Sequence, residues 1–360
     1  MKWSFRIATV AGIPIYLHAT FVALIVFLFV QDWLRGEDLA AALAGIFFIL
    51  SIFGTVVLHE FGHALMARHY GVQTKDITLL PIGGLARLER LPDVPRQELW
   101  VALAGPAVNL GLAAITGLVL LVTDTVPEAG EWSRAQGFLP RFLLVNVWLA
   151  LFNLIPAFPM DGGRALRALL AERMDYVRAT ETAARLGQGL ALVFSFFGLF
   201  TNPFLVFIAL FVWMGASAEA SSVSLRSAIA GIPVARAMIT DFRTVEATDT
   251  LGHAASLIIA GSQRDFPVLD GGQLAGILTR DALVKAIAAH GVASRVREAM
   301  TTAFERVDAR EMLERALEKL QQCECPVLPV MLGDRLVGLL TADNVGEYVM
   351  IQGAIPQQSR

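Results

Sequence analysis

The stretch that decides the fold of the N-terminal half is Leu39–His63, LAAALAGIFFILSIFGTVVLHEFGH. Its first part, Leu39–Leu58, contains no charged side chain, and an α-helix needs roughly 20 apolar residues to cross a bilayer. A His-Glu pair and a further histidine follow directly. Polar side chains at the end of such a helix are energetically costly and mark functional sites. The stretch therefore predicts a membrane-spanning helix that ends in a polar functional site.

The spacing of these polar residues is that of a metal site. His59 and His63 lie four residues apart, so a helix brings both imidazoles to one face. Neutral imidazole is a good zinc ligand, and Glu60 between them can take a proton from water activated by the metal. The alternative is that the three side chains only hydrogen-bond at the membrane surface.

A catalytic zinc site needs a third protein ligand, and Asp161 is the candidate. It follows another apolar segment within Asn153–Gly163, NLIPAFPMDGG. The prolines end the helix and the glycines allow a tight turn, so the carboxylate can point inward. A site of three protein ligands with one open position is the arrangement of catalytic zinc.

Further uncharged segments predict about six membrane helices. The candidates besides Leu39–Leu58 are Ile13–Val30, Leu99–Val122, Phe142–Phe158 and Leu186–Ala218, the last divided in two at Asn202-Pro203. Basic residues decide the orientation, because they favour the cytosolic side. They precede the first segment and follow the second and fourth, as Lys2, Arg6, Arg68, Arg87, Arg164 and Arg178 illustrate. We therefore expect a multi-pass protein of the cell (inner) membrane, with its N-terminus and C-terminal region in the cytosol.

The membrane half, roughly residues 1–218, resembles the site-2 protease family of intramembrane metalloproteases. The resemblance is carried by His59-Glu60-x-x-His63 with the distant Asn153-x-x-Pro-x-x-Pro-x-Asp161-Gly, and by Gly83-Gly84 and Gly105-Pro106 with Asn109. It implies zinc held by His59, His63 and Asp161, Glu60 as general base, and Asn153 holding or polarising the substrate. The substrate would be a membrane-embedded segment of another protein. We also expect Val72–Arg90 to form a hairpin or re-entrant loop, whose edge can pair with an unwound substrate strand; a purely structural loop is the alternative.

The C-terminal region repeats itself at an offset of 62 residues. Ala237-Met238 recurs as Ala299-Met300, Phe266-Pro-Val as Leu328-Pro-Val, and Gly276-Ile-Leu-Thr-Arg-Asp as Gly338-Leu-Leu-Thr-Ala-Asp. Short β-runs beside amphipathic helices predict two small α/β modules. They resemble a pair of CBS domains. The resemblance implies that Thr279, Asp281, Thr341 and Asp343 bind an adenine nucleotide, ATP or AMP; a purely structural or homodimer-forming module is the alternative.

The expected fold is thus a polytopic α-helical membrane domain with a C-terminal α/β CBS pair. We place the metalloprotease domain at residues 1–220, a linker at 221–231, the CBS domains at 232–293 and 294–353, and a tail at 354–360. A formal net charge of −3 gives no reason to expect a nucleic-acid partner. Cys323 and Cys325 make no disulfide framework, and we expect them to be small, partly buried residues.

Two other function classes compete with the protease. A transporter or channel gated by the CBS pair would have polar residues along several helices and internal symmetry in the membrane half, and the sequence has neither. An inactive relative acting as a scaffold would not need His59, Glu60, His63 and Asp161 intact. We therefore predict a regulated intramembrane zinc endopeptidase whose partners are the bilayer and a transmembrane protein substrate.

Overall fold

A computed structural model of the chain describes residues 3–36, 38–81, 83–90, 92, 94–128, 137–323 and 325–354. Lys2 and most of the predicted tail lie outside the described residues. The chain separates into two compact units, Met1–Val223 and Ser224–Arg360. This separation is coarser than the predicted domain boundaries, which stay a prediction.

The N-terminal unit begins with a small sheet rather than with a membrane helix. Strands β1 (Ser4–Val10) and β2 (Ile13–His18) form a hairpin, and β3 (Thr74–Leu80) and β4 (Gly83–Leu88) form another, in the order β1-β2-β3-β4. The pairing of β2 with β3 is parallel. The predicted helix over Ile13–Val30 is therefore wrong in its first part. Ala11 and Gly12 both have positive φ and make the tight turn between β1 and β2. Residues 13–18 therefore form a strand, and the helix begins only after them.

The hairpin predicted over Val72–Arg90 is present as β3 and β4. Its registry pairs Asp76 with Arg87, and the Arg87 Nε donates to Asp76 Oδ1 at 2.9 Å. Asp76 is buried, and its ion pair with Arg87 holds strands β3 and β4 together. In the described sheet, strand β4 has only one strand neighbour, and the face that carries Ile77 and Ala86 packs on helix α2 (Leu39–His69).

Among the residues that the structure describes, four helices are long and apolar enough to cross a membrane: α2 (Leu39–His69), α3 (Pro95–Val122), α6 (Tyr176–Phe200) and α7 (Phe204–Ile229). Helices α1 (Ala19–Leu34) and α4 (Phe138–Asn153) are apolar but have 16 residues each. Counting these two gives the predicted number of about six. The break between α6 and α7 falls at Asn202-Pro203, as expected.

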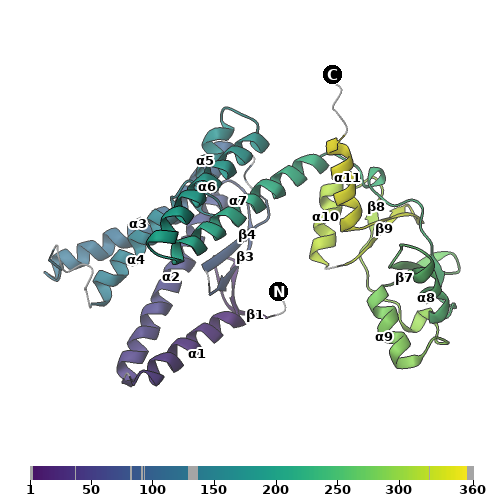
Figure 1. Cartoon of the computed structure of the whole chain (residues 1–360), viewed down its shortest axis with the longest axis horizontal. Helices are drawn as coiled ribbons and strands as arrows, with labels where there is room; N and C mark the ends of the chain where they lie inside the picture. The colour runs from purple at the N-terminus through teal and green to yellow at the C-terminus, as the bar shows by residue number, and fades with distance from the viewer. Residues whose placement is uncertain are drawn as a thin grey trace. The chain divides into compact units, whose positions relative to one another are not determined.

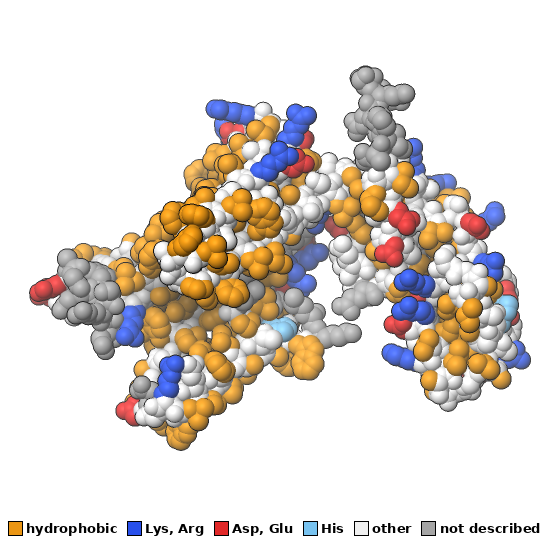
Figure 2. All heavy atoms as spheres, viewed as in Figure 1, with side chains coloured by type: hydrophobic (Ala, Val, Ile, Leu, Met, Phe, Trp, Pro, Cys, Tyr) orange, Lys and Arg blue, Asp and Glu red, His pale blue; other side chains and the backbone are white. Residues whose placement is uncertain are grey.

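Large apolar side chains cover the outer faces of these helices. On α6 and α7 they include Phe196, Phe200, Phe207 and Phe211, all exposed, and Figure 2 shows such side chains in orange over this unit. An apolar surface of this extent marks contact with another apolar phase, and for long apolar helices that phase is lipid. The protein is a membrane protein with a mostly helical N-terminal unit (Figure 1).

Helix α2 continues past the polar motif, so the motif lies within the helix and not at its end. A short amphipathic helix, α5 (Asp161–Ala171), follows α4 after a proline-containing loop. Asp161 is the first residue of α5 and does not close the preceding segment, because the helix before it already ends at Asn153.

The C-terminal unit consists of two copies of one α/β module, as the repeat predicted. The first contains β5 (Val245–Glu246), α8 (Leu251–Ala260), β6 (Phe266–Asp270), β7 (Gln273–Leu278) and α9 (Arg280–His290). The second contains β8 (Val307–Asp308), α10 (Leu313–Gln322), β9 (Leu328–Leu332), β10 (Arg335–Leu340) and α11 (Ala342–Ala354). Each module forms one three-stranded sheet.

The two modules exchange backbone hydrogen bonds symmetrically. Ile239, in the segment before β5, pairs with Leu339 of β10, and Thr301 pairs with Ile277 of β7. Residues 239 and 301, and residues 277 and 339, correspond at the offset of 62 found in the sequence. Cys323 and Cys325 are partly buried, as expected, but a disulfide joins them just after α10, which was not predicted.

Candidate metal centre

Helix α2 presents two buried imidazoles one turn apart. His59 and His63 are both buried, and their ring centroids lie 4.8 Å apart. Positions i and i+4 of a helix share a face, which is why both rings can point to one place. The α2 helix passes α3 closely here: a Cβ added at Gly62 would lie 2.7 Å from the Ala104 carbonyl oxygen.

The carboxylate of Asp161 meets the two imidazoles. Its Oδ2 lies 3.1 Å from the Nε2 atoms of both His59 and His63, and these two nitrogens are 3.1 Å from each other. The three atoms therefore form an equilateral triangle. Ligand atoms at zinc-bond lengths of about 2.0–2.1 Å in a tetrahedral site stand about 3.3 Å apart, so the triangle has the size that a zinc ion requires.

The outer ring nitrogens fix which way the lone pairs point. His63 Nδ1 lies 2.7 Å from the Val101 carbonyl oxygen, which can only accept a hydrogen bond. That nitrogen must carry a proton, so in the neutral ring Nε2 presents its lone pair. His59 Nδ1 lies 2.7 Å from Asn109 Oδ1, which accepts in the same way. Two lone pairs and a carboxylate oxygen thus face one another, an arrangement that a cation stabilises.

A glycine keeps the space beside these atoms free. A Cβ built on Gly105 of α3 would lie 2.2 Å from His63 Nε2 and 2.6 Å from His59 Nε2. Real carbon–nitrogen contacts between non-bonded atoms are never that short, so any side chain here would displace the imidazoles or fill the place of an ion. The donor set and this cradle together fit zinc.

The position of Asp161 depends on how α5 begins. A Cβ at Gly162 would lie 2.3 Å from the Ile155 carbonyl oxygen, and one at Gly163 would lie 2.6 Å from the backbone of Ala157. The two glycines therefore allow the first turn of α5 to pack directly on the backbone of the preceding loop. This close packing places the Asp161 carboxylate at the imidazoles.

The side chain of Glu60 extends from α2 to strand β4 of the sheet. Its Oε2 accepts a hydrogen bond from the Ala86 backbone N–H of β4 at 3.2 Å, and a Cβ at Gly84 would lie 2.7 Å from Glu60 Cγ. The edge of β4 that has no strand partner thus points its N–H at this carboxylate. Gly84 gives Glu60 the room to lie there, a role that was not predicted from the sequence.

Asn153, the other predicted catalytic residue, makes its hydrogen bond within its own helix. Its Nδ2 donates to the Leu149 carbonyl oxygen at 2.9 Å, and it is the last residue of α4. His18 caps the first turn of α1, because its Nδ1 accepts from the Thr20 backbone N–H. Neither residue belongs to the triangle of ligand atoms.

A second buried polar cluster, formed by α3, α5 and α7, was not predicted. Arg167 of α5 is fully buried and donates to Glu98 of α3 and to Glu219 of α7. No local pattern points to this cluster, because the three residues are 52 or more positions apart and an arginine near a membrane helix suggests lipid phosphates first. We call these three residues the Arg167 cluster.

The four residues predicted to bind nucleotide lie at the starts of two helices. Thr279 Oγ1 accepts from the Ala282 backbone N–H and Thr341 Oγ1 from the Asn344 backbone N–H, so both threonines act as N-caps, of α9 and α11. Asp281 and Asp343, each two residues further, are exposed. The two pairs therefore have matching structural environments in the two modules.

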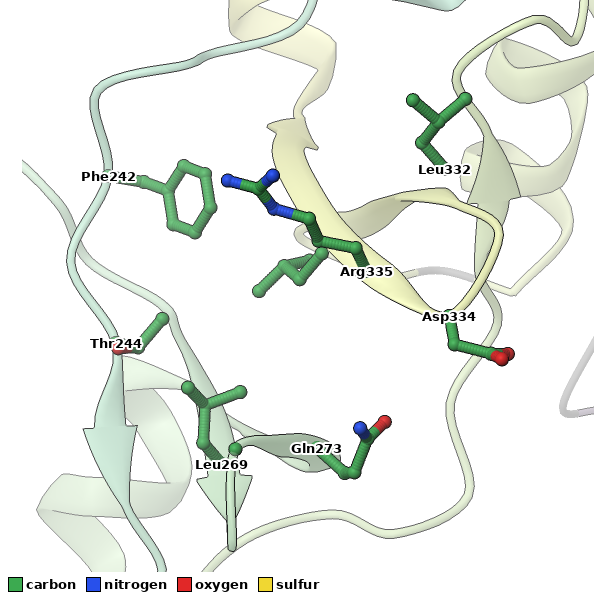
Figure 3. A pocket seen from close by; sticks show the side chains of 9 residues that line it. Phe242, Thr244, Leu269, Gln273, Leu332, Asp334 and Arg335 are labelled. Carbon is green, nitrogen blue, oxygen red and sulfur yellow. The ribbon is translucent and has the colours of Figure 1, made fainter.

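A pocket of about 490 Å³ lies elsewhere in this unit, at the turns of the two β-hairpins. Figure 3 shows the Arg335 guanidinium pointing toward the ring of Phe242, with Asp334 and Gln273 at the rim. Its lining includes none of the four predicted residues. Thr279 follows β7 at the end opposite Gln273, so the pocket and the predicted site are at opposite ends of the strand.

Comparisons with known proteins match both units. The Peptidase family M50 model matches residues 47–131 and 126–194, a range that includes His59, His63 and Asp161, and the CBS domain model matches residues 234–289. A zinc metalloprotease of Methanocaldococcus jannaschii is 35% identical over 279 residues, which are 77% of this chain and 78% of that protein. Rip3 of Mycobacterium tuberculosis is 28% identical over 385 residues, which cover 97% of this chain and 93% of that protein.

A solved structure also aligns with the chain. The site-2 protease from Methanocaldococcus jannaschii aligns with 37% identity and a TM-score of 0.44, covering 61% of this chain and 95% of that one.

Proposed function

Because the chain belongs to peptidase family M50, the site-2 type of zinc metalloprotease, and carries CBS domains, we propose that it hydrolyses a peptide bond within or near a transmembrane segment of another membrane protein. The observation that carries this proposal is the triangle of His59 Nε2, His63 Nε2 and Asp161 Oδ2, with 3.1 Å sides. A ligand set of this kind, buried in a unit of apolar helices, suits hydrolysis at membrane depth.

His59, His63 and Asp161 are the residues that would hold the zinc ion. When bound, zinc supplies a Lewis acid for the peptide carbonyl and lowers the pKa of water toward about 7. Asn109 and the Val101 carbonyl hold the two imidazoles in the tautomer that binding requires. Gly105 leaves the ion and the attacking water the space they need.

Glu60 is the general base in this proposal. Its carboxylate takes a proton from the attacking water and returns it to the amine that leaves when the peptide bond breaks. One water is consumed for each peptide bond broken: its oxygen bonds to the carbonyl carbon and the proton taken by Glu60 goes to the leaving nitrogen, so the products are a carboxylic acid and an amine, which near neutral pH are a carboxylate and an ammonium group. The Ala86 N–H that Glu60 accepts from supports the assignment, because it holds the carboxylate next to the strand edge.

The substrate is proposed to bind along the edge of β4 that has no strand partner. A transmembrane helix hides its peptide bonds in its own hydrogen bonds, so it must unwind before cleavage, and an unwound segment can add to a sheet edge. A strand paired with β4 would run past Glu60. Asn153 would hold or polarise the substrate, which requires its amide to exchange the Leu149 carbonyl for the substrate.

Co-expression with candidate single-span proteins tests the proposal. The wild-type chain should produce a truncated product, and Glu60→Gln should abolish it while zinc remains bound. Glu181→Gln, on the surface of α6, is the matched control and should cleave normally. A purified, folded wild-type protein that binds no zinc would rule the proposal out.

The membrane orientation follows from the basic residues. We propose that the protein lies in the cell (inner) membrane with its N-terminus and both CBS domains in the cytosol, because Arg68, Arg87 and Arg178 follow the second and fourth apolar segments. Added protease should digest the C-terminal unit in inverted membrane vesicles and leave it intact in spheroplasts. The opposite pattern would reverse the assignment.

We propose that the CBS pair, residues 232–293 and 294–353, binds ATP or AMP and modulates cleavage. The support is the matching placement of Thr279-Asp281 and Thr341-Asp343 at two helix starts. Calorimetric titration of the full chain should detect the nucleotide, and binding should weaken in Asp281→Ala and Asp343→Ala, whose exposed side chains make little contribution to folding. Unchanged binding in both variants would favour the pocket at the hairpin turns, and no binding in the wild type would favour a purely structural or homodimer-forming module.

A further inference from the structure

Arg167 lies at the centre of a buried network that no part of the proposed chemistry uses. Its guanidinium carbon lies 5.2 Å from the ring centroid of Phe158 and 5.1 Å from that of Tyr176. Its Nε donates to Glu98 Oε1 at 2.8 Å, its Nη2 donates to the same carboxylate, and its Nη1 donates to Glu219. The side chain is fully buried, as is nearly all of Glu98.

This network joins α5, which carries the ligand Asp161, to α3, whose Val101 carbonyl and Asn109 side chain orient the imidazoles of α2. Arg167 is on α5, the helix that begins with Asp161, and Phe158 belongs to the loop on which the first turn of α5 packs. Glu98 is on α3, one turn before Val101, whose carbonyl orients His63. The Arg167–Glu98 pair is therefore a direct, charge-assisted link between the helix of the carboxylate ligand and the helix that orients the imidazoles.

We propose that Arg167 is a positioning residue for the metal centre. Its two-nitrogen pairing with Glu98 fixes α5 against α3 and so keeps Asp161 Oδ2 at its 3.1 Å distance from the two Nε2 atoms. This inference rests on the proposed function, since it concerns the same zinc site.

The geometry of the pair is what makes it suited to this role. Arg167 Nε and Nη2 both donate to the single oxygen Glu98 Oε1, and two donors that converge on one acceptor restrict its direction as well as its distance. Packed hydrophobic side chains can hold two helices together equally well, and replacing a buried ion pair by them is often neutral for stability. They do not fix the sliding of one helix along the other to a few tenths of an ångström, which is the tolerance of a metal site.

Variants of the pair separate positioning from stability. Arg167→Lys keeps the charge and loses the two converging donors. The double variant Glu98→Leu with Arg167→Met replaces the pair by apolar side chains of similar size, and Glu219, whose side chain is 30% exposed, can then be solvated. Arg185→Lys, on the exposed face of α6, is the matched control.

The full-length protein in detergent is measured in three ways: zinc affinity by chelator competition, the visible absorption spectrum of the cobalt-substituted protein, and thermal melting of the metal-free form. We expect both Arg167 variants to bind zinc about 10- to 100-fold more weakly and to show an altered cobalt spectrum. The double variant should melt close to wild type in the metal-free form. Arg185→Lys should match wild type in all three.

Wild-type zinc affinity and cobalt spectrum in the double variant would overturn the inference, because an apolar contact would then position Asp161 equally well. A loss of affinity that only parallels a loss of metal-free stability across the variants would overturn it too. If the wild-type protein bound no zinc, the proposed function would fail first, and that result is distinct from both.

Discussion

The N-terminal unit contains two buried polar clusters that differ in where their positive charge comes from. In the first, two imidazoles and the Asp161 carboxylate face one another with three acceptor atoms. In the second, two carboxylates surround the guanidinium of Arg167, so the cation is part of the chain. Helices α3 and α5 contribute to both clusters.

The space around the two clusters differs in the same sense. At the first, Gly105 has no side chain and leaves room beside the two Nε2 atoms. At the second, the rings of Phe158 and Tyr176 lie against the guanidinium and fill the space. A cluster that receives its cation from solution needs open space and a vacant coordination position. A cluster whose cation is a side chain needs no such space, and packed side chains can fill it.

The largest expected effect comes from closing the open cluster. Gly105→Ala would place a methyl group 2.2 Å from His63 Nε2, so we expect loss of zinc binding by more than about 100-fold, beyond the range for residues that only orient ligands, and loss of cleavage. Gly111→Ala on the same helix α3, where a Cβ meets nothing within 4 Å, is the control. Equal zinc affinity in both variants, measured by chelator competition, would contradict this account of the site.

Removing the metal should lower the melting temperature only when the His59, His63 and Asp161 ligands are intact. A ligand present at about 1,000 times its Kd stabilises the folded state by about 4 kcal/mol, so a chelator should lower the melting temperature of the wild-type protein. Asp161→Ala, which lacks a ligand, should melt at the same temperature with and without chelator. A chelator effect of equal size in that variant would place the metal elsewhere.

Gly84→Ala should separate the base from the metal. The added Cβ would lie 2.7 Å from Glu60 Cγ and displace that carboxylate, so cleavage should fall by about 100-fold, within the range of general-base contributions. Zinc content should stay at the wild-type level because Gly84 does not contact the three ligand atoms. Gly54→Ala on α2, where a Cβ has open space, should retain both. Zinc loss in Gly84→Ala would mean that the hairpin also supports the ligands.

The asparagines of α3 and α4 should differ in their effects. Asn109 orients His59, so Asn109→Ala should weaken zinc binding by about 10-fold, the lower end for such partners. Asn153 bonds its own helix, so Asn153→Ala should keep zinc affinity and slow cleavage. Chelator competition and the rate of product formation measure the two effects. Reversed effects would exchange the roles assigned to the two residues.

The sequence could predict the open cluster but not the closed one, and the reason is physical. Two histidines at helical spacing bring their own geometry, and the motif that contains Asp161 supplied the third ligand. Nothing in the local pattern of Arg167 indicates partners 69 and 52 residues away. Charge alone does not reveal burial, and an arginine after an apolar segment is first expected among lipid headgroups, so the buried pairing of Arg167 could not be predicted.

The fold shows the same division. The repeat at 62 residues predicted both C-terminal modules, since two copies of one sequence pattern form the same elements. The strands β1 and β2 were missed because a run of apolar residues at the start of a chain fits a membrane helix by composition. The hairpin depends on the positive φ values of Ala11 and Gly12, and these values cannot be seen in a sequence.

The smallest expected effect is the weaker of two within the Arg167 cluster, and their difference tests how tightly that cluster is closed. Glu98 is almost fully buried, whereas the Glu219 side chain is 30% exposed. Glu98→Gln leaves a buried guanidinium short of charge and should lower the unfolding free energy by about 3 kcal/mol. Glu219→Gln should lower it by about 1 kcal/mol, because water already solvates part of that pair. Denaturant unfolding of the metal-free protein measures both, and equal losses would mean that α7 closes the cluster as tightly as α3 does.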